Sequence, residues 1–346
     1  MYITNMEEAQ EFSEFFTNIP NAINTELQKT AEDLNINIET WERTYNQDQH
    51  QKFNFKPVSA DEILKFFSKS SKKSVGVDGI SYNILKLASP SIAQPLTSLI
   101  NHMISTSKFP SDLKISKINP IYKKGDKNLK SNYRPISILP SISKLFERIL
   151  NNQLNNHLET NSLYDNMQSG FRKKHSTNTA LLYMVDSWIK NMDSGKITGV
   201  LALDLSKAFD CLSHSSISSA FDALLHSSAS STKLITDYLT DHKACVYFNS
   251  NRSSLNSIND GVPQGSILGP TLFISALTDI KNILGDINYH IYADDLTIWT
   301  SDKDPQKIIS RLEEVSQKIF KYFAGNGLKL NIDKTQFMYI GTVVLS

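Results

Sequence analysis

An acidic pair between two apolar runs constrains the fold of this chain more than any other stretch. Residues 286–300 read DINYHIYADDLTIWT, with Asp294 and Asp295 at the centre. The flanking Tyr, Ile and Trp residues favour strands, so the stretch predicts a hairpin with both acids at its tip. Two unit charges about 4 Å apart repel by roughly 1 kcal/mol in water and by about 4 kcal/mol at an effective dielectric constant of about 20. By itself the pair also fits an exposed turn.

A second acidic strand end favours a functional reading. Residues 199–210 read GVLALDLSKAFD, in which an apolar run ends on Asp204. If the two predicted strands are neighbours in one sheet, Asp204 meets Asp294 and Asp295. Three carboxylates in one place have the composition of a two-metal phosphoryl-transfer site, because carboxylate oxygens are ligands that Mg²⁺ prefers.

Four further motifs accompany these two stretches. In order, within residues 57–342, the six motifs read NYRPISIL, GFRKKHST, LDLSKAFD, GVPQGSILGP, YADD and GLKLNIDKT. Together they resemble the reverse transcriptases of non-long-terminal-repeat (LINE-like) retrotransposons. The resemblance implies an α+β right-hand polymerase fold, with fingers and an antiparallel palm sheet packed against helices. It also implies an RNA-directed DNA polymerase that uses an RNA template, a DNA primer and deoxynucleoside triphosphates. The implied cofactor is a pair of Mg²⁺ ions, with Mn²⁺ as a substitute.

The resemblance assigns roles to individual residues of this chain. Asp204, Asp294 and Asp295 bind the metal ions, together with the backbone carbonyl of Leu205. Lys334 protonates the departing pyrophosphate, since negative charge builds up on the leaving group. The remaining expected site residues contact the incoming nucleotide: Lys123, Lys124 and Arg134 on the fingers, Phe209 as a steric gate, and Gln264 with Gly265 in a loop. A surface salt bridge remains an alternative for Arg134, and a plain core position for Phe209.

The predicted organisation is an N-terminal extension followed by one polymerase domain. Residues 1–35 show amphipathic helical spacing interrupted at Pro20, and residues 36–56 are polar, which predicts a linker remnant. The polymerase domain is expected at 57–346, with fingers mainly at 57–190 and palm mainly at 191–346.

Local patterns predict several elements of the polymerase domain. Ser59 followed by Glu62 predicts a capping box at the start of a helix. Apolar spacing predicts helices at 141–160, 267–280 and 305–323, and residues 115–122 form a predicted strand.

The charge distribution is uneven although the formal net charge is only +1. Residues 1–62 carry 4 basic and 12 acidic side chains, which leaves the excess of positive charge on the part with the motifs. Residues 108–134 are rich in Lys and Arg and either follow a phosphate backbone or form a solvated face. The basic loop at 168–177 likewise either contacts the template or combines a helix cap with solvated charges.

Targeting and redox features are few. No apolar run is long enough to cross a membrane, and residues 1–20 do not read as a signal peptide. Cys211 and Cys245 lack metal-ligand spacing, which favours a reducing intracellular setting, in the nucleus or the cytoplasm. Nothing in the sequence identifies a protein partner.

The position of Ser346 leads to a further expectation. It follows shortly after the motif containing Lys334, before the primer-grip hairpin and thumb of the resembling enzymes, so we expect a truncated copy in which the thumb is missing. A catalytically inactive RNA-binding relic is therefore one alternative function. A maturase-like RNA-binding splicing factor on the same fold is the other.

Overall fold

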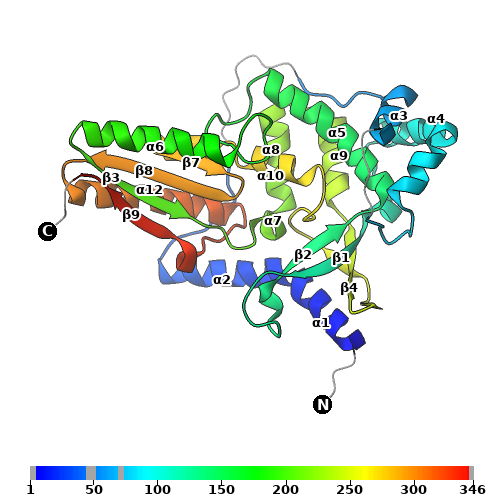
Figure 1. Cartoon of the computed structure of the whole chain (residues 1–346), viewed down its shortest axis with the longest axis horizontal. Coiled ribbons are helices and arrows are strands. Elements are labelled where there is room, and N and C mark those ends of the chain that lie inside the picture. The colour runs from blue at the N-terminus through cyan, green and yellow to red at the C-terminus, as the bar shows by residue number, and fades with distance from the viewer. Residues whose placement is uncertain (1–4, 44–51, 69–73, 343–346) are drawn as a thin grey trace.

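The structure, a computed structural model, describes residues 5–43, 52–68 and 74–342 (Figure 1). Part of the expected linker, at 44–51, and the last residues, at 343–346, lie outside the described residues. The described part contains two sheets surrounded by helices, so the predicted α+β class is confirmed.

The first sheet contains the predicted fingers hairpin. β1 (Ile115–Tyr122) pairs antiparallel with β2 (Tyr133–Ile138), and β1 also pairs in parallel with β4 (His242–Phe248). The short strands β5 (Asn251–Arg252) and β6 (Asn256–Ile258) both pair with β4. The strand predicted at 115–122 is confirmed.

The second sheet is antiparallel throughout and has the order β7-β8-β3-β9. Its strands are β7 (Asn288–Tyr292), β8 (Asp295–Asp302), β3 (Ile197–Leu203) and β9 (Gln336–Ile340). Leu203 at the end of β3 pairs with Leu296 near the start of β8. Asp204 therefore follows β3 directly beside the β7–β8 turn, as expected from the two acidic strand ends.

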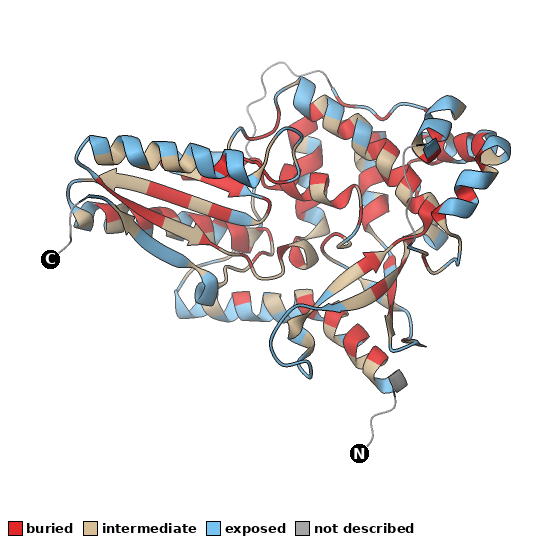
Figure 2. Cartoon of the chain, in the orientation of Figure 1, coloured by how far each residue is buried: buried red, intermediate tan, exposed pale blue. Residues whose placement is uncertain are grey.

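Helices cover both faces of this sheet (Figures 1 and 2). On one face lies α12 (Pro305–Gly325), so close that a Cβ atom on Gly199 would lie 2.2 Å from Cγ2 of Ile308. On the other face lies α6 (Thr177–Asp193), where Nε1 of Trp299 donates a hydrogen bond of 3.0 Å to Oγ of Ser187. The packing fixes the sheet, and with it the acidic turn at its end.

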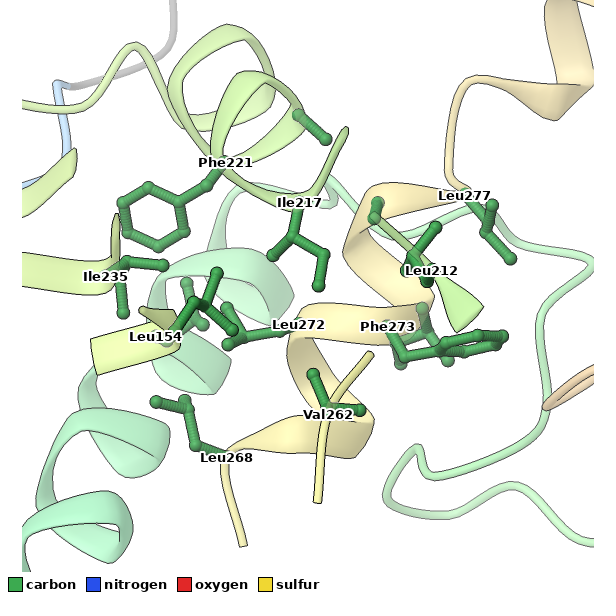
Figure 3. Close-up of a cluster of buried hydrophobic side chains, with 14 of the residues drawn as sticks. Leu154, Leu212, Ile217, Phe221, Ile235, Val262, Leu268, Leu272, Phe273 and Leu277 are labelled. Atoms are coloured by element: carbon green, nitrogen blue, oxygen red, sulfur yellow. The ribbon is translucent and has the colours of Figure 1, made fainter. Parts of the chain in front are cut away.

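A helical body joins the two sheets. α5 (Ser141–Thr160), α8 (His214–Leu225), α9 (Ala229–Leu239) and α10 (Gly269–Ala276) surround the apolar cluster of Figure 3. The helix predicted at 141–160 is confirmed, as is the one at 305–323, which runs on to Gly325. The other described helices after residue 57 are α3 (Ala60–Ser68), α4 (Tyr82–Thr106), α7 (Ala208–Cys211), α11 (Ile280–Leu284) and the 3₁₀ turns η1 (Ser111–Lys114), η2 (Lys130–Asn132) and η3 (Ile332–Lys334).

The capping box predicted from Ser59 and Glu62 is confirmed, whereas the single helix predicted at 267–280 is wrong. Glu62 and Ser59 exchange the hydrogen bonds of a capping box before α3. The single helix predicted through 267–280 is instead divided into α10 and α11. The backbone carbonyl of Ala276 accepts a 2.8 Å hydrogen bond from Nη1 of Arg43, which occupies an oxygen that a continuous helix would use.

The N-terminal residues pack onto the body of the protein. α1 (Asn5–Thr17) and α2 (Ile19–Asp33) meet near Pro20, which lies in the first turn of α2, where a missing backbone N–H costs little. Beyond them, Arg43 forms a buried ion pair with Asp279 at 3.2 Å. The domain boundary at residue 56 stays a prediction, but α1, α2 and Arg43 are packed against the rest of the protein.

Candidate active site

All of the expected site residues line one cleft of about 1430 Å³. The cleft lies between the β1–β2 hairpin and the end of the second sheet where β3 and the β7–β8 turn meet. The residues are Lys123, Lys124, Arg134, Asp204, Leu205, Phe209, Gln264, Gly265, Asp294, Asp295 and Lys334.

The acidic turn is a tight hairpin as predicted, but only Asp294 of the two acids lies in its loop, since Asp295 is the first residue of β8. Tyr292 pairs with Asp295, so Ala293 and Asp294 form the turn, and Ala293 has φ +61°. Oε1 of Gln168 accepts hydrogen bonds from the backbone N–H groups of Ala293, at 3.1 Å, and Gly170, at 2.8 Å. A Cβ atom on Gly170 would lie 2.2 Å from the backbone nitrogen of Ala293. Only glycine therefore lets the segment support the turn.

The carboxylates at this end of the sheet are electrostatically coupled. Burial raises the pKa of Asp294, and the charge of Asp204 raises it further. Burial also raises the pKa of Asp295, with additional contributions from Asp294 and Asp204. The charge of Asp204 therefore acts on both Asp294 and Asp295, which indicates that the three side chains lie close together.

Lys334 forms a hydrogen bond with Asp204, one of these three carboxylates. Its Nζ donates a hydrogen bond of 2.8 Å to Oδ2 of Asp204, and the backbone of Asp204 accepts another of 2.8 Å from the N–H of Asn331. Leu205 is buried and forms an isolated bridge with Leu330, so its backbone is fixed in the same region. Lys334 is thus positioned by the turn η3, which precedes β9.

Cations line the opposite wall of the cleft. Arg134 is exposed on β2, and Lys123 and Lys124 directly follow β1. Burial lowers the pKa of Lys123, and the charge of Arg134 lowers it further, which shows that the two cations are close enough to interact. No ion pair between described residues involves Arg134, so the surface salt-bridge alternative finds no partner there.

An aromatic side chain and a tight loop complete the cleft. The ring of Phe209 stacks on Phe273 with centroids 4.3 Å apart, and it also lines the cleft. Gly265 has φ +126°, and a Cβ atom there would lie 2.4 Å from the backbone oxygen of Ser137. The loop can therefore approach β2 closely only with glycine at this position.

The family model for reverse transcriptase (RNA-dependent DNA polymerase) matches residues 121–344, a range that contains all of these cleft residues. The chain belongs to this family. The resemblance on which the sequence interpretation depended is thereby confirmed.

Relatives of this reverse transcriptase chain come from mobile elements. It is 30% identical over 253 residues to the RNA-directed DNA polymerase from mobile element jockey of Drosophila funebris, covering 70% of this chain and 27% of that protein. It is 26% identical over 286 residues to the jockey polymerase of Drosophila melanogaster, covering 80% and 31%. The chain thus spans less than a third of the length of these relatives.

A solved structure supports the polymerase fold. Apo telomerase from Candida tropicalis, truncated from its C-terminal domain, superimposes with a TM-score of 0.50 at 14% identity. The match covers 74% of this chain and 56% of the telomerase chain. At this identity the likeness concerns the fold, which agrees with the predicted fingers and palm.

The basic segments of this reverse transcriptase are only partly available to a ligand. Within 108–134, Lys114 is buried and paired with Asp237 at 3.1 Å, and Lys130 is paired with Glu11 at 2.7 Å. Within the basic loop at 168–177, Arg172 pairs with Glu159, and Ser176 caps α6. The cap formed by Ser176 bears out that part of the alternative for the loop, whereas Lys114 and Arg172 are paired and largely buried and are not solvated charges. A template contact by the loop stays a prediction.

Sequence reasoning missed one wall of the cleft. Glu11, Glu14 and Glu26 from α1 and α2 line it, and Figure 1 shows α2 running from the palm sheet towards the fingers hairpin. Glu26 forms an ion pair with Lys329, and Nζ of Lys207 lies 4.4 Å from the centre of the Phe15 ring. The excess of acidic residues near the N-terminus was the available signal, but their spacing in the sequence could not show that they line the cleft.

No described helix is both long and apolar enough to traverse a membrane.

Proposed function

We propose that this chain is the polymerase-bearing region of an RNA-directed DNA polymerase from a non-long-terminal-repeat retrotransposon. It copies an RNA template into DNA by adding deoxynucleotides to a DNA primer, a reaction that we assign to the inside of the cell, in the nucleus or cytoplasm. Residues 57–190 act mainly as fingers and 191–346 mainly as palm. The observation that carries the proposal is the single cleft in which three acidic side chains face the fingers cations.

Asp204, Asp294 and Asp295 would hold the two Mg²⁺ ions of this reaction, together with the carbonyl of Leu205. The donor set fits in kind, because hard divalent cations prefer carboxylate and carbonyl oxygens, and the pKa values of Asp294 and Asp295 are raised first by burial and then by the neighbouring negative charges. Among the described residues no three such side chains are grouped as metal ligands, and Oδ2 of Asp204 is bonded to Lys334. When bound, the ions would activate the primer hydroxyl and stabilise charge on the phosphates.

The protein's own residues position the nucleotide in this proposal. Arg134, with Lys123 and Lys124, holds the triphosphate, since a guanidinium group binds phosphate oxygens in a bidentate manner. Phe209 closes the space beside the sugar, which excludes a 2′-hydroxyl, and Gly265 allows the backbone to approach the nucleotide. Lys334 donates a proton to the pyrophosphate as it leaves.

Primer extension by the purified chain tests this proposal. The assay contains an RNA template, a DNA primer, deoxynucleotides and Mg²⁺. We expect extension by the parent chain and none by Asp294→Asn/Asp295→Asn. Asp302→Asn, which removes a carboxylate at the far end of β8, serves as the control and retains activity. If the parent binds RNA but does not extend the primer, an RNA-binding function replaces the polymerase assignment.

A further inference from the structure

Asp210 forms hydrogen bonds with Gln264, a residue of the proposed nucleotide site. It follows Phe209 in α7, and its carboxylate lies against the side chain of Gln264 across the loop that precedes α10. Nε2 of Gln264 is 2.8 Å from Oδ1 and 2.7 Å from Oδ2 of Asp210. The carboxamide is therefore held by both oxygens of one carboxylate.

The backbone around this pair is fixed on both sides. The N–H of Val262 donates to the carbonyl of Phe209 at 2.7 Å, and a Cβ atom on Gly261 would lie 2.5 Å from the carbonyl oxygen of Asp210. On the other side, the carbonyl of Gln264 accepts a 2.7 Å hydrogen bond from the N–H of Ser137 on β2. The loop has little freedom to move away, so the side-chain contact decides which way the amide of Gln264 faces.

The charge of Asp210 determines which atom of the Gln264 amide faces it. Burial raises the pKa of Asp210 to about 6, while the hydrogen bond from Gln264 and the charge of Lys207 lower it. At neutral pH the carboxylate is ionised and can only accept hydrogen bonds. Nε2 of Gln264 must therefore face Asp210, and Oε1 is left for another partner.

The oxygen of Gln264 is available to a ligand. Both Gln264 and Asp210 line the cleft, and within the described part of the chain Oε1 of Gln264 accepts no hydrogen bond. An amide presented in this orientation offers an acceptor to the cleft. A reversed amide would offer two donors instead.

We propose that Asp210 is a positioning residue that fixes the carboxamide of Gln264, so that Gln264 presents Oε1 as a hydrogen-bond acceptor to a donor group of the incoming nucleotide. The proposal rests on the proposed function of the cleft. It adds Asp210 as a positioning residue and specifies that Gln264 accepts a hydrogen bond from the nucleotide. Asp210 acts through Gln264 and does not itself contact the nucleotide. Because Phe209 precedes it, the same carboxylate also ties the aromatic wall to the loop.

A double-mutant cycle tests the coupling. Asp210→Ala should raise the KM for deoxynucleotides about tenfold with a smaller change in kcat, which is the effect of losing one charge-assisted hydrogen bond. In a Gln264→Ala background the same substitution should have no further effect. Equal effects in both backgrounds would show that Asp210 does not act through Gln264.

A polarity swap separates positioning from a merely structural role. Gln264→Glu places two carboxylates against each other and should weaken nucleotide binding by more than Asp210→Ala does. Adding Asp210→Asn supplies a donor that can face Glu at position 264, so the double variant should bind nucleotide better than Gln264→Glu alone. If it does not, the assigned polarity is wrong. Asp260→Ala, which removes a half-buried carboxylate from the start of the same loop, is the matched control with unchanged KM.

Two measurements without turnover distinguish failure of this inference from failure of the proposed function. Equilibrium binding of a deoxynucleoside triphosphate in Ca²⁺ is compared between the parent and the variants, with thermal unfolding as a check on folding. NMR of the Gln264 side-chain amide should show slowed hydrogen exchange that Asp210→Ala abolishes. Rapid exchange in the parent would overturn the inference alone, whereas a parent that binds no nucleotide would overturn both.

Discussion

Nζ of Lys334 lies 2.8 Å from Oδ2 of Asp204, so a cation of the chain itself neutralises one of the three cleft carboxylates. The two side chains are 54% and 26% exposed, which means that solvent weakens their attraction considerably. A metal ion at Asp204 competes with this pair. Lys334 therefore has two opposing effects in the proposed reaction: it protonates the leaving group and it reduces the affinity of the acids for a cation.

Removal of Lys334 should separate these effects. We predict that Lys334→Ala binds Mn²⁺ roughly fivefold more tightly, corresponding to the ~1 kcal/mol of a partly exposed ion pair, and extends primers more slowly. Titration of free Mn²⁺ by electron paramagnetic resonance measures the first effect. Lys329→Ala, which removes a lysine paired with Glu26, is the control. Unchanged or weaker Mn²⁺ binding by Lys334→Ala would contradict the prediction.

Gly170 should be intolerant of a side chain. Its added Cβ atom would collide with the backbone of Ala293, so Gly170→Ala must shift the turn that carries Asp294. We predict a loss of about 1–3 kcal/mol of unfolding free energy from overpacking. A displacement of about 1 Å at the acids would lower primer extension by about 100-fold. Urea denaturation and extension rates measure the two effects.

Gly341→Ala is the matched control for Gly170→Ala. A Cβ atom there would lie 3.5 Å from its nearest neighbour, Cγ1 of Ile197, which is an ordinary contact. This variant should keep both stability and activity. If both alanine variants behave alike, close packing at Gly170 is not what holds the acidic turn.

The buried ion pair between Arg43 and Asp279 should contribute strongly to stability. The two side chains are only 4% and 0% exposed, and Asp279 also accepts hydrogen bonds from Trp41 and Tyr322. Arg43→Met leaves a buried carboxylate without its cation and should cost about 3–5 kcal/mol. Adding Asp279→Asn should recover part of this, because the uncompensated charge is removed.

Urea denaturation measures these differences in unfolding free energy. Lys190→Ala breaks an exposed ion pair with Asp186 on α6 and serves as the control, with an expected loss far smaller than that of Arg43→Met. A comparable loss in Lys190→Ala and Arg43→Met would mean that burial of the Arg43 pair is unimportant.

Glu147 should make stability depend on pH. It is fully buried, and its carboxylate accepts hydrogen bonds of 2.6 Å from the hydroxyl of Tyr238 and from the backbone N–H of Ile267. Burial raises its pKa. The folded state therefore retains this proton to higher pH than the unfolded state, so the contribution of Glu147 is most favourable below about pH 4.3 and is lost as pH rises through the raised pKa.

Glu147→Gln removes this titration while keeping a group that can bond Tyr238 and Ile267. As pH rises from about 4.3 to the raised pKa of Glu147, we predict that the unfolding free energy of the parent falls relative to that of Glu147→Gln. Above that pKa the difference between the two proteins should stay constant. Urea denaturation between pH 4 and 8 follows the difference. Glu313→Gln on the exposed face of α12 is the control, and parallel curves for the parent and Glu147→Gln would refute the prediction.

Local patterns in the sequence were sufficient for elements whose stability is local. The apolar run around Ile118 and the helical spacing through Leu145 and Leu154 predicted β1 and α5 correctly, because each pattern involves only residues close together in the sequence. The acidic hairpin was predictable for the same reason. Its contact with Asp204 followed from pairing two strand ends, which the register confirms.

Contacts between distant polar residues were not predictable in this way. Arg43 stands in a polar stretch, and nothing near it indicates that Asp279 will balance its charge. The support of Ala293 by Gln168 and the contact of Asp210 with Gln264 also join segments that carry no matching local pattern. Each of these pairs is favourable only after the apolar core has placed the two backbones side by side, so their energetic effect is invisible until the fold is known.

The central position of β3 has a consequence for synthesis of the chain. Both of its neighbours, β8 and β9, are encoded later, so β3 leaves the ribosome with two unpaired edges. At about 5–20 residues per second, the first partner follows roughly 5–20 s after it. During that interval an apolar strand with free backbone groups is exposed to other chains. Production of this protein should therefore benefit from slower initiation or lower temperature, which reduces the number of nascent chains waiting in this state at one time.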